Sequence, residues 1–475
     1  MSSSSSSSSS DEQGSGNGNG NRGGDYEGPS ASRRRFVDGV WPEPFVESLA
    51  YQVAIDASNS SGRLAAGPAL FNLFQVCSTW REVSRSELLW QNLTGQIWNR
   101  HRLPHPHTTW REEFIFRHRT ARNFRSRRYH YSTLHFNDNI NGDNEDENEG
   151  EETILSCRRL VLSDNHLAAG FSDGCVRLFS LPSRVHLSTF RPHHRDRLGR
   201  FSRAVSGIIL SETRVVFASH DGDIHVAPVG SNVVATRRSV YGDVLNDGAL
   251  VDFCGSNRKW VGLYAGVPGR AFHVWNGESE ELIFVGGTLT DPEAVMGWHL
   301  LTDLTEFVGR VRVTNQELAI ACTSLRVIVF DLGNLGFIIS EEAPRRGVIV
   351  GSVDTNGESL AMVDNRGLGS VRLPETLQEV CRFMVRGVGG GGGGGGLVGC
   401  MNLGYVVMCG GGGIVRVWSV DNGGGGDGEY LYGMRERIGG GGGGLGFGNA
   451  ITADERHVAA WSGDLTIHLW DFGAR

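Results

Sequence analysis

The chain has 475 residues, with 45 basic against 53 acidic side chains and a formal net charge of −8. A chain of this length is expected to form two or more folded units. The tract from Asp138 to Glu152 holds eight acidic residues and no Lys or Arg, so it supplies the whole charge excess. The balanced remainder gives no sign of a polyanion or of a general nucleic-acid-binding protein.

The sequence shows no apolar run long enough to span a membrane and no signal-peptide pattern, so neither a membrane span nor secretion is expected. The eight cysteines are scattered and include no C-x-x-C pair. This spacing favours reduced, mostly buried thiols over disulfides or metal ligands. Residues 1–38 are rich in Ser, Gly and Asn without apolar periodicity, which predicts a disordered tail.

Residues 39–127 are predicted to form a small all-α module with a linker helix. Pro44 suits the first turn of a helix, and the apolar residues that follow it have helical spacing. The stretch 70–98 holds two further helical stripes separated by a polar turn. The segment 57–68 between these helices is expected to be a long connection.

Within this module V-C-S-T-W-R, followed by L-L-W, resembles the C-terminal half of an F-box. An F-box is the helical module that docks on the adaptor of SCF-type ubiquitin ligases. The resemblance implies that adaptor contact and the module's own core are shared among eight residues: Pro44, Leu49, Leu73, Phe74, Val76, Trp80, Leu89 and Trp90.

Thr109 and Glu112 form a capping box at the start of the next expected helix. One side of this helix is apolar, and arginines occupy the other side from Arg117 to Arg128. Arginines at this spacing could follow a nucleic-acid backbone. A solvated face on a helix that links two domains, or a nuclear-import signal, is the interpretation we favour.

From Tyr129 onward the apolar period changes to two, which predicts strands. A small-residue strand, a Gly or Asp-Gly turn and a second strand then recur seven times, beginning near His166 and ending with Trp470-Asp471. The pattern is typical of WD-repeat blades, so an all-β, seven-bladed WD-repeat-type propeller is expected over 128–475. The strand at 129–136 is expected to pair with the last repeat and close the ring.

Long connections between the expected blades should emerge on one face, where binding residues commonly lie. Arg197, Arg200 and Arg203 could grip an acidic or phosphorylated segment through bidentate bonds, and Trp298 with His299 could supply an aromatic anchor. Loop solvation or packing is the alternative for each. The glycine runs lack the setting of a phosphate-binding loop. The sequence shows no other motif of this kind, so no catalytic residue, cofactor or metal is expected.

Several longer segments resemble one family of plant floral regulators: WPEPFVESLA, FRHRTARNFR, GRFSRAVSGI, FVGGTLTDPEAVMGWH and HLWDFGA. The resemblance implies a nuclear, non-catalytic substrate receptor of an SCF-type E3 ubiquitin ligase. Its helical module would bind the adaptor and, through it, cullin. Its propeller would bind repressor proteins of the PEAPOD and KIX type for degradation, which would regulate flower and organ development. This interpretation includes neither membrane contact nor direct nucleic-acid contact.

A DNA-associated transcriptional regulator that uses the arginine-rich helix at 117–128 is the alternative. The two interpretations differ in what should be measured. A receptor should co-purify with adaptor and cullin, whereas a DNA-binding protein should shift duplex DNA with a steep salt dependence.

Overall fold

The computed structural model describes residues 41–103, 108–136, 155–192, 200–230, 236–287, 309–323, 326–343, 350–364, 366–385, 398–410, 413–421, 426–437, 450–462 and 465–474. The expected disordered tail, the acidic tract and three candidate binding residues (Arg197, Trp298 and His299) lie outside these ranges. Among the described residues, no helix is both long and apolar enough to cross a membrane.

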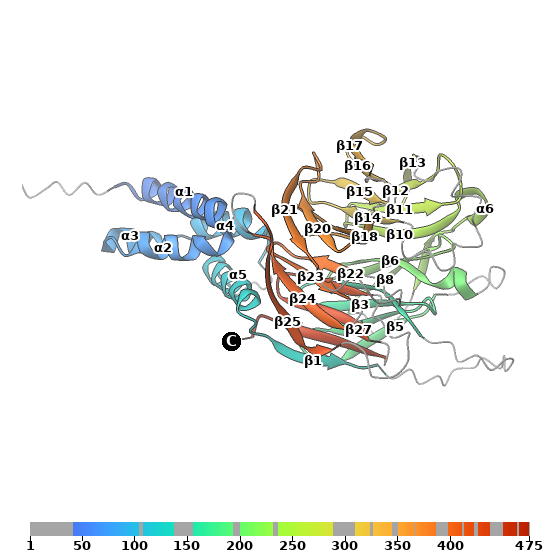
Figure 1. The fold of residues 1–475 in the computed structure, drawn as a ribbon, viewed down its shortest axis with the longest axis horizontal. Coiled ribbons are helices and arrows are strands. Elements are labelled where there is room, and N and C mark those ends of the chain that lie inside the picture. Colours follow the sequence, from blue (N-terminus) through green and yellow to red (C-terminus); the bar gives the residue numbers. More distant parts are fainter. Residues whose placement is uncertain are drawn as a thin grey trace, which may run out of the picture.

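The N-terminal part is a helical module built around one apolar core. Ser86 caps one helix by accepting from the Leu89 N–H, and Thr109 with Glu112 forms the expected capping box of the last one. Figure 1 shows these helices to one side of the β-structure. The elements are α1 (Glu43–Ser61), η1 (Arg63–Ala65), α2 (Ala66–Phe74), α3 (Ser78–Val83), α4 (Glu87–Trp98) and α5 (Trp110–Arg125).

The sequence predicted a long connection at 57–68, but this segment is largely helical. Its first residues continue α1 to Ser61, where Gly62 ends the helix with a φ of +85°. A Cβ at Gly62 would lie 2.4 Å from the carbonyl oxygen of Asp421 in the propeller, so glycine also permits a close approach there. The rest of the segment is helical as η1 and the start of α2.

The remainder is a propeller whose sheets follow one another around a ring (Figure 1). Gly174 and Gly222 have positive φ in the Asp-Gly turns that the sequence predicted. The strands of the first two four-stranded sheets are β1 (His130–Leu134), β26 (Ile451–Ala453), β27 (His457–Ser462) and β28 (Thr466–Asp471); and β2 (Cys157–Leu162), β3 (His166–Phe171), β4 (Val176–Ser180) and β5 (His186–Phe190).

Three further sheets also have four strands each. They are β14 (Arg310–Val313), β15 (Leu318–Cys322), β16 (Val327–Asp331) and β17 (Ile338–Glu342); β18 (Val350–Thr355), β19 (Leu360–Asp364), β20 (Leu368–Arg372) and β21 (Glu379–Met384); and β22 (Val398–Met401), β23 (Tyr405–Cys409), β24 (Ile414–Ser419) and β25 (Glu429–Arg437).

The expectation of seven separate blades is wrong. Five sheets are four-stranded blades, and the other eight strands form one continuous sheet in the order β13-β12-β11-β10-β6-β7-β8-β9. Its strands are β6 (Val205–Leu210), β7 (Arg214–Ser219), β8 (Ile224–Pro228), β9 (Arg237–Val240), β10 (Ala249–Gly255), β11 (Lys259–Ala265), β12 (Phe272–Asn276) and β13 (Leu282–Gly286), with η2 (Arg200–Arg203) before β6 and α6 (Val244–Asp247) before β10.

A glycine explains why these eight strands merge. β6 and β10 run parallel and pair at Gly207 and Phe253. A Cβ at Gly207 would lie 1.9 Å from the Phe253 carbonyl oxygen, so any larger residue would keep the two strands apart. The sequence repeat describes strands and turns within each unit and carries no signal for this pairing between units.

The strand expected at 129–136 is present as β1, and it pairs antiparallel with β28 from His130–Asp471 to Leu134–Ile467. The first strands of neighbouring sheets also contact one another around the ring, from β2 to β6 and onward to β22, β26 and back to β2. The first strand of the propeller, β1, and its last strand, β28, therefore lie in the same sheet, which closes the ring. This pairing protects the edge of β28.

The helical module packs directly on the propeller through α5 and η1. Phe124 of α5 is fully buried and stacks on Phe472 with 3.7 Å between ring centroids. Asn123 donates to the Phe472 carbonyl at 2.8 Å, and Tyr405 donates to the Ala121 carbonyl at 2.7 Å. These contacts fix α5 against the last two sheets.

Candidate functional site

Most residues that the F-box resemblance assigned to adaptor contact lie in the module's own core. Leu73, Leu89 and Trp90 are buried, and the Trp90 indole donates to the Ser84 carbonyl at 2.7 Å. Leu49, Phe74 and Trp80 pack partly buried against the same cluster, whereas Pro44 and Val76 are exposed. A helical core requires these apolar positions, so most of the motif serves the module's own packing.

The residues predicted to bind a target on the propeller are not gathered into a site among the described residues. Arg200 and Arg203 belong to η2, and Arg203 is half-buried there. Their expected neighbours at 197, 298 and 299 lie outside the described ranges.

Two groups of arginines lie on and beside α5, and the sequence does not distinguish them. Arg117 is directed into the junction, where its Nε donates to the buried Glu113 carboxylate at 2.7 Å. Burial disfavours the charge of Arg117, but the carboxylates of Glu113, Glu455 and Asp454 together outweigh this effect and raise the pKa of Arg117. Arg127, after the helix, lies over the Tyr432 ring at 5.7 Å. Arg127 therefore contacts the propeller directly, whereas the hydrogen bond of Arg117 stays within α5.

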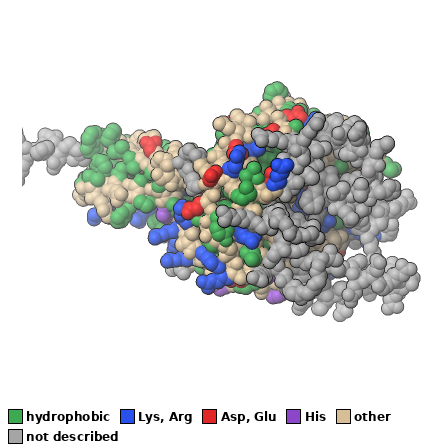
Figure 2. All heavy atoms as spheres, in the orientation of Figure 1, with side chains coloured by type: hydrophobic (Ala, Val, Ile, Leu, Met, Phe, Trp, Pro, Cys, Tyr) green, Lys and Arg blue, Asp and Glu red, His purple; other side chains and the backbone are tan. Residues whose placement is uncertain are grey.

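The other group faces solvent, and we call it the basic strip: Arg122, Arg125, Arg128 and Arg435. Arg125 pairs with Glu429 at 3.0 Å, but both side chains are about half exposed, so the pair stabilises little. Tyr129 lies beside Arg435, whose backbone N–H donates to the Tyr129 hydroxyl at 3.4 Å. The strip therefore runs from α5 onto β25, the outermost strand of its sheet. Figure 2 shows Lys and Arg side chains gathered over this region.

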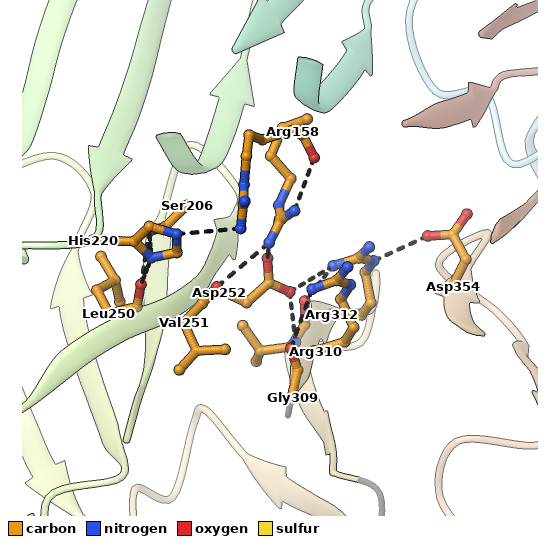
Figure 3. Close-up of polar contacts among 12 residues, drawn as sticks. Arg158, Ser206, His220, Leu250, Val251, Asp252, Gly309, Arg310, Arg312 and Asp354 are labelled. Carbon is orange, nitrogen blue, oxygen red and sulfur yellow. Dashed lines mark hydrogen bonds and ion pairs between the residues drawn. The ribbon is translucent and has the colours of Figure 1, made fainter. Parts of the chain in front are cut away.

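A second polar cluster lies among the first strands of the sheets (Figure 3). The Asp252 side chain is 1% exposed. Its carboxylate pairs with Arg159 of β2 and Arg312 of β14, each at 3.0 Å, and accepts the Val311 N–H at 2.9 Å. Burial alone would raise the pKa of Asp252, but the two guanidinium groups hold it below its ordinary value. Arg312 also donates to Asp354 at 3.0 Å, which extends the cluster to β18.

His220 belongs to the same cluster and is neutral at pH 7. Burial, and then the charge of Arg158, lower the pKa of His220 to about 4. Its Nδ1 lies 2.8 Å from the Leu250 carbonyl and therefore donates, whereas Nε2 accepts from Arg158 at 3.3 Å. Each charge meets a partner from another sheet, so this cluster ties the ring together rather than performing chemistry.

The described residues offer little to metal or thiol chemistry. Within these ranges no group of three or more His, Cys, Asp or Glu side chains could hold a metal ion. The eight cysteines are free, and five of them are buried. Burial raises the pKa of Cys381 and of Cys409 to about 11, so these thiols stay protonated at neutral pH.

Comparison with known proteins places the chain in a family. A relative from Arabidopsis thaliana named "Transcriptional regulator STERILE APETALA" is 55% identical over 458 residues, which cover 95% of this chain and 96% of the relative. The chain belongs to the STERILE APETALA family. No family model matches it. A solved β-propeller domain of Myceliophteria thermophila Cps50 (Swd1) is 11% identical, with a TM-score of 0.47 over 66% of this chain and 96% of that domain.

These findings correct the functional expectation. The family resemblance is confirmed, but the relative is named a transcriptional regulator, which contradicts the expected ubiquitin-ligase substrate receptor. No F-box or WD-repeat family model matches the chain, so neither of these two assignments has support. The name favours the alternative in its coarser part, a regulator of transcription.

Proposed function

We propose that the chain is a nuclear transcriptional regulator that contacts DNA through the basic strip. The observation that carries the proposal is the 55% identity, over nearly the whole chain, to a protein named a transcriptional regulator. A regulator of transcription acts in the nucleus, and DNA is the polyanion that a strip of exposed arginines suits there.

The form of the strip supports contact with a phosphate backbone. The 16 residues of α5 extend over roughly 24 Å, and the strip continues from its last turn onto β25. Arginine binds phosphate bidentately, and contacts of this kind position a protein on DNA without reading the sequence. Glu429 is the carboxylate that pairs within the strip, and its half-exposed ion pair with Arg125 can be exchanged for a phosphate at low cost.

Duplex binding measured by fluorescence anisotropy against salt concentration tests the proposal. The variant carries Arg122→Gln, Arg125→Gln and Arg128→Gln together. The slope of log K against log salt changes by about 0.9 for each phosphate that is no longer neutralised, so we expect the slope to become shallower by about 2.7. A matched variant with Arg85→Gln, Arg258→Gln and Arg326→Gln has the same net charge and removes only exposed ion pairs.

The control variant should bind the duplex as the unchanged chain does. The proposal is wrong if the unchanged chain gives no salt-dependent binding, or if both triple variants weaken binding by the same amount. A reporter assay in plant nuclei with the two variants connects binding to transcription, and only the strip variant should lose regulation.

A further inference from the structure

An apolar groove with a basic rim lies between α2 and α5, beside the basic strip. Its volume is about 480 Å³, and Leu70, Phe74, Trp90 and Phe114 are among the residues that line it. Two further lining residues are large and exposed, Phe71 at 61% and Ile115 at 47%. The volume falls within the range of roughly 300–1,000 Å³ typical of sites that bury a ligand.

The two helices form this groove because each turns one face toward the other. Gly67, Leu70, Phe71 and Phe74 follow the i, i+3, i+4, i+7 spacing on α2. The helices lie close together at Gly67, where a Cβ would lie 2.6 Å from the His118 ring. That ring donates to the Leu64 carbonyl at 3.0 Å. The groove lies beside this contact, lined by Phe71 and Phe74 of α2 and by Ile115 of α5.

The rim is positive. Arg81, Arg111, Arg119 and Arg122 line the groove, and the lining residues include no Asp or Glu. Arg81 and Arg111 are exposed, and Arg119 lies over the Phe116 ring at 5.7 Å. A ligand that fits must therefore bring apolar side chains for the floor and negative charge for the rim.

We propose that this groove binds an acidic amphipathic segment of a partner protein, as a helix with Leu or Phe on one face and Asp or Glu on the other. Helices dock in apolar grooves through anchors at i, i+3, i+4 and i+7. Segments that combine acidic and apolar residues are typical of transcriptional activation domains, which suits a partner of a nuclear regulator.

Two other occupants fit less well. The acidic tract of this chain at 138–152 contains one large apolar residue, Ile140, so it offers charge without anchors for the floor. A nucleic acid would meet the rim arginines but would leave Phe71 and Ile115 exposed to its phosphates. The apolar floor therefore favours a protein segment.

A labelled helical peptide of about 15 residues, with Leu and Phe on one face and Glu on the other, is the probe. Its anisotropy is measured with the full chain. One comparison peptide carries Ser in place of Leu and Phe, and a second carries Lys in place of Glu. We expect binding of the first peptide alone, and a loss of about tenfold or more in affinity with Ile115→Glu and with Arg111→Glu.

Both substituted residues are exposed, so the fold should persist, and a thermal melt checks this. Leu245→Glu is the matched control, because Leu245 is 91% exposed on α6, away from the groove, and this variant should bind normally. Arg111→Glu should also gain binding to the Lys peptide, which a loss of folding could not produce.

Three results would overturn the proposal: equal binding of all three peptides, unchanged affinity with Ile115→Glu, or loss of DNA binding in Arg111→Glu. The last would make the groove part of a nucleic-acid surface. Arg125→Gln with Arg128→Gln separates this proposal from the proposed function, since that variant should lose DNA and keep the peptide.

Discussion

Glu455 lies in the turn between β26 and β27, where the helical module meets the propeller. We expect this residue to make the folded chain more stable in acid. Its Oε1 accepts the Leu403 N–H at 3.0 Å. Burial raises the pKa of Glu455 to about 7, against opposing effects of that hydrogen bond and of Arg63 and Arg117 from the helical module. The folded chain therefore binds this proton more tightly than the unfolded chain does between pH 4.5 and about 7.

The sign and size of the effect follow from linkage. The contribution of Glu455 to the free energy of unfolding is fully present below pH 4.5 and is lost as pH rises through about 7. Above that pH, Glu455 causes no further change in stability. The pKa difference corresponds to about 3 kcal/mol at about 1.36 kcal/mol per pKa unit. Because Glu455 keeps some solvent exposure, we expect about 1–3 kcal/mol.

Glu455→Gln keeps the carbonyl acceptor for Leu403 and removes the charge. At pH 8 the free energy of unfolding of this variant should exceed that of the unchanged chain by about 1–3 kcal/mol, seen as a higher denaturant midpoint. At pH 4.5 the two midpoints should be nearly the same. Glu278→Gln, on an exposed carboxylate elsewhere in the propeller, should change neither value. A lower stability of the Glu455→Gln variant at pH 8 would refute the reasoning, because an ionised Glu455 would then be stabilising Arg63 and Arg117.

Three other predictions concern the ring. Asp252→Ala leaves two guanidinium groups without their shared carboxylate and should lower the free energy of unfolding by about 3–5 kcal/mol, measured by denaturant titration. Gly207→Val should separate β6 from β10, because its Cβ would lie 1.9 Å from the Phe253 carbonyl oxygen, and faster amide exchange confined to these strands would report it. Deleting 130–134 exposes the edge of β28, so the fragment 128–475 should melt at a lower temperature, whereas an unchanged melt would contradict the role of β1.

Strands and turns of the propeller could be read from the sequence because their signals are local. The segment beginning at His166 forms β3 and β4 around the Asp173-Gly174 turn, as its alternation and positive-φ glycine predicted. The pairing of strands from different repeats is not local. Gly207 looks like any small strand residue in the sequence, and only its approach to Phe253 joins eight strands into one sheet.

The candidate surfaces show the same limit. The sequence identifies α5 as an amphipathic, arginine-rich helix, but the partner that engages Arg125 lies 304 residues farther along the chain. No spacing rule connects residues so distant, so the sequence could not show which arginines remain exposed. It also identifies the apolar faces of α2 and α5 separately. The groove is lined by residues of both helices, so it depends on packing between segments that the sequence does not specify.

The position of α5 connects the two proposed surfaces. One side of the helix is fixed to the propeller through Phe124, and Arg122 belongs both to the basic strip and to the rim of the groove. An acidic segment in the groove would engage Arg122 and place carboxylates beside the strip. It should therefore weaken DNA binding and make its salt dependence shallower by about 0.9, the share of one phosphate contact. Because coupling between two ligands is reciprocal, DNA should weaken the acidic segment by the same factor.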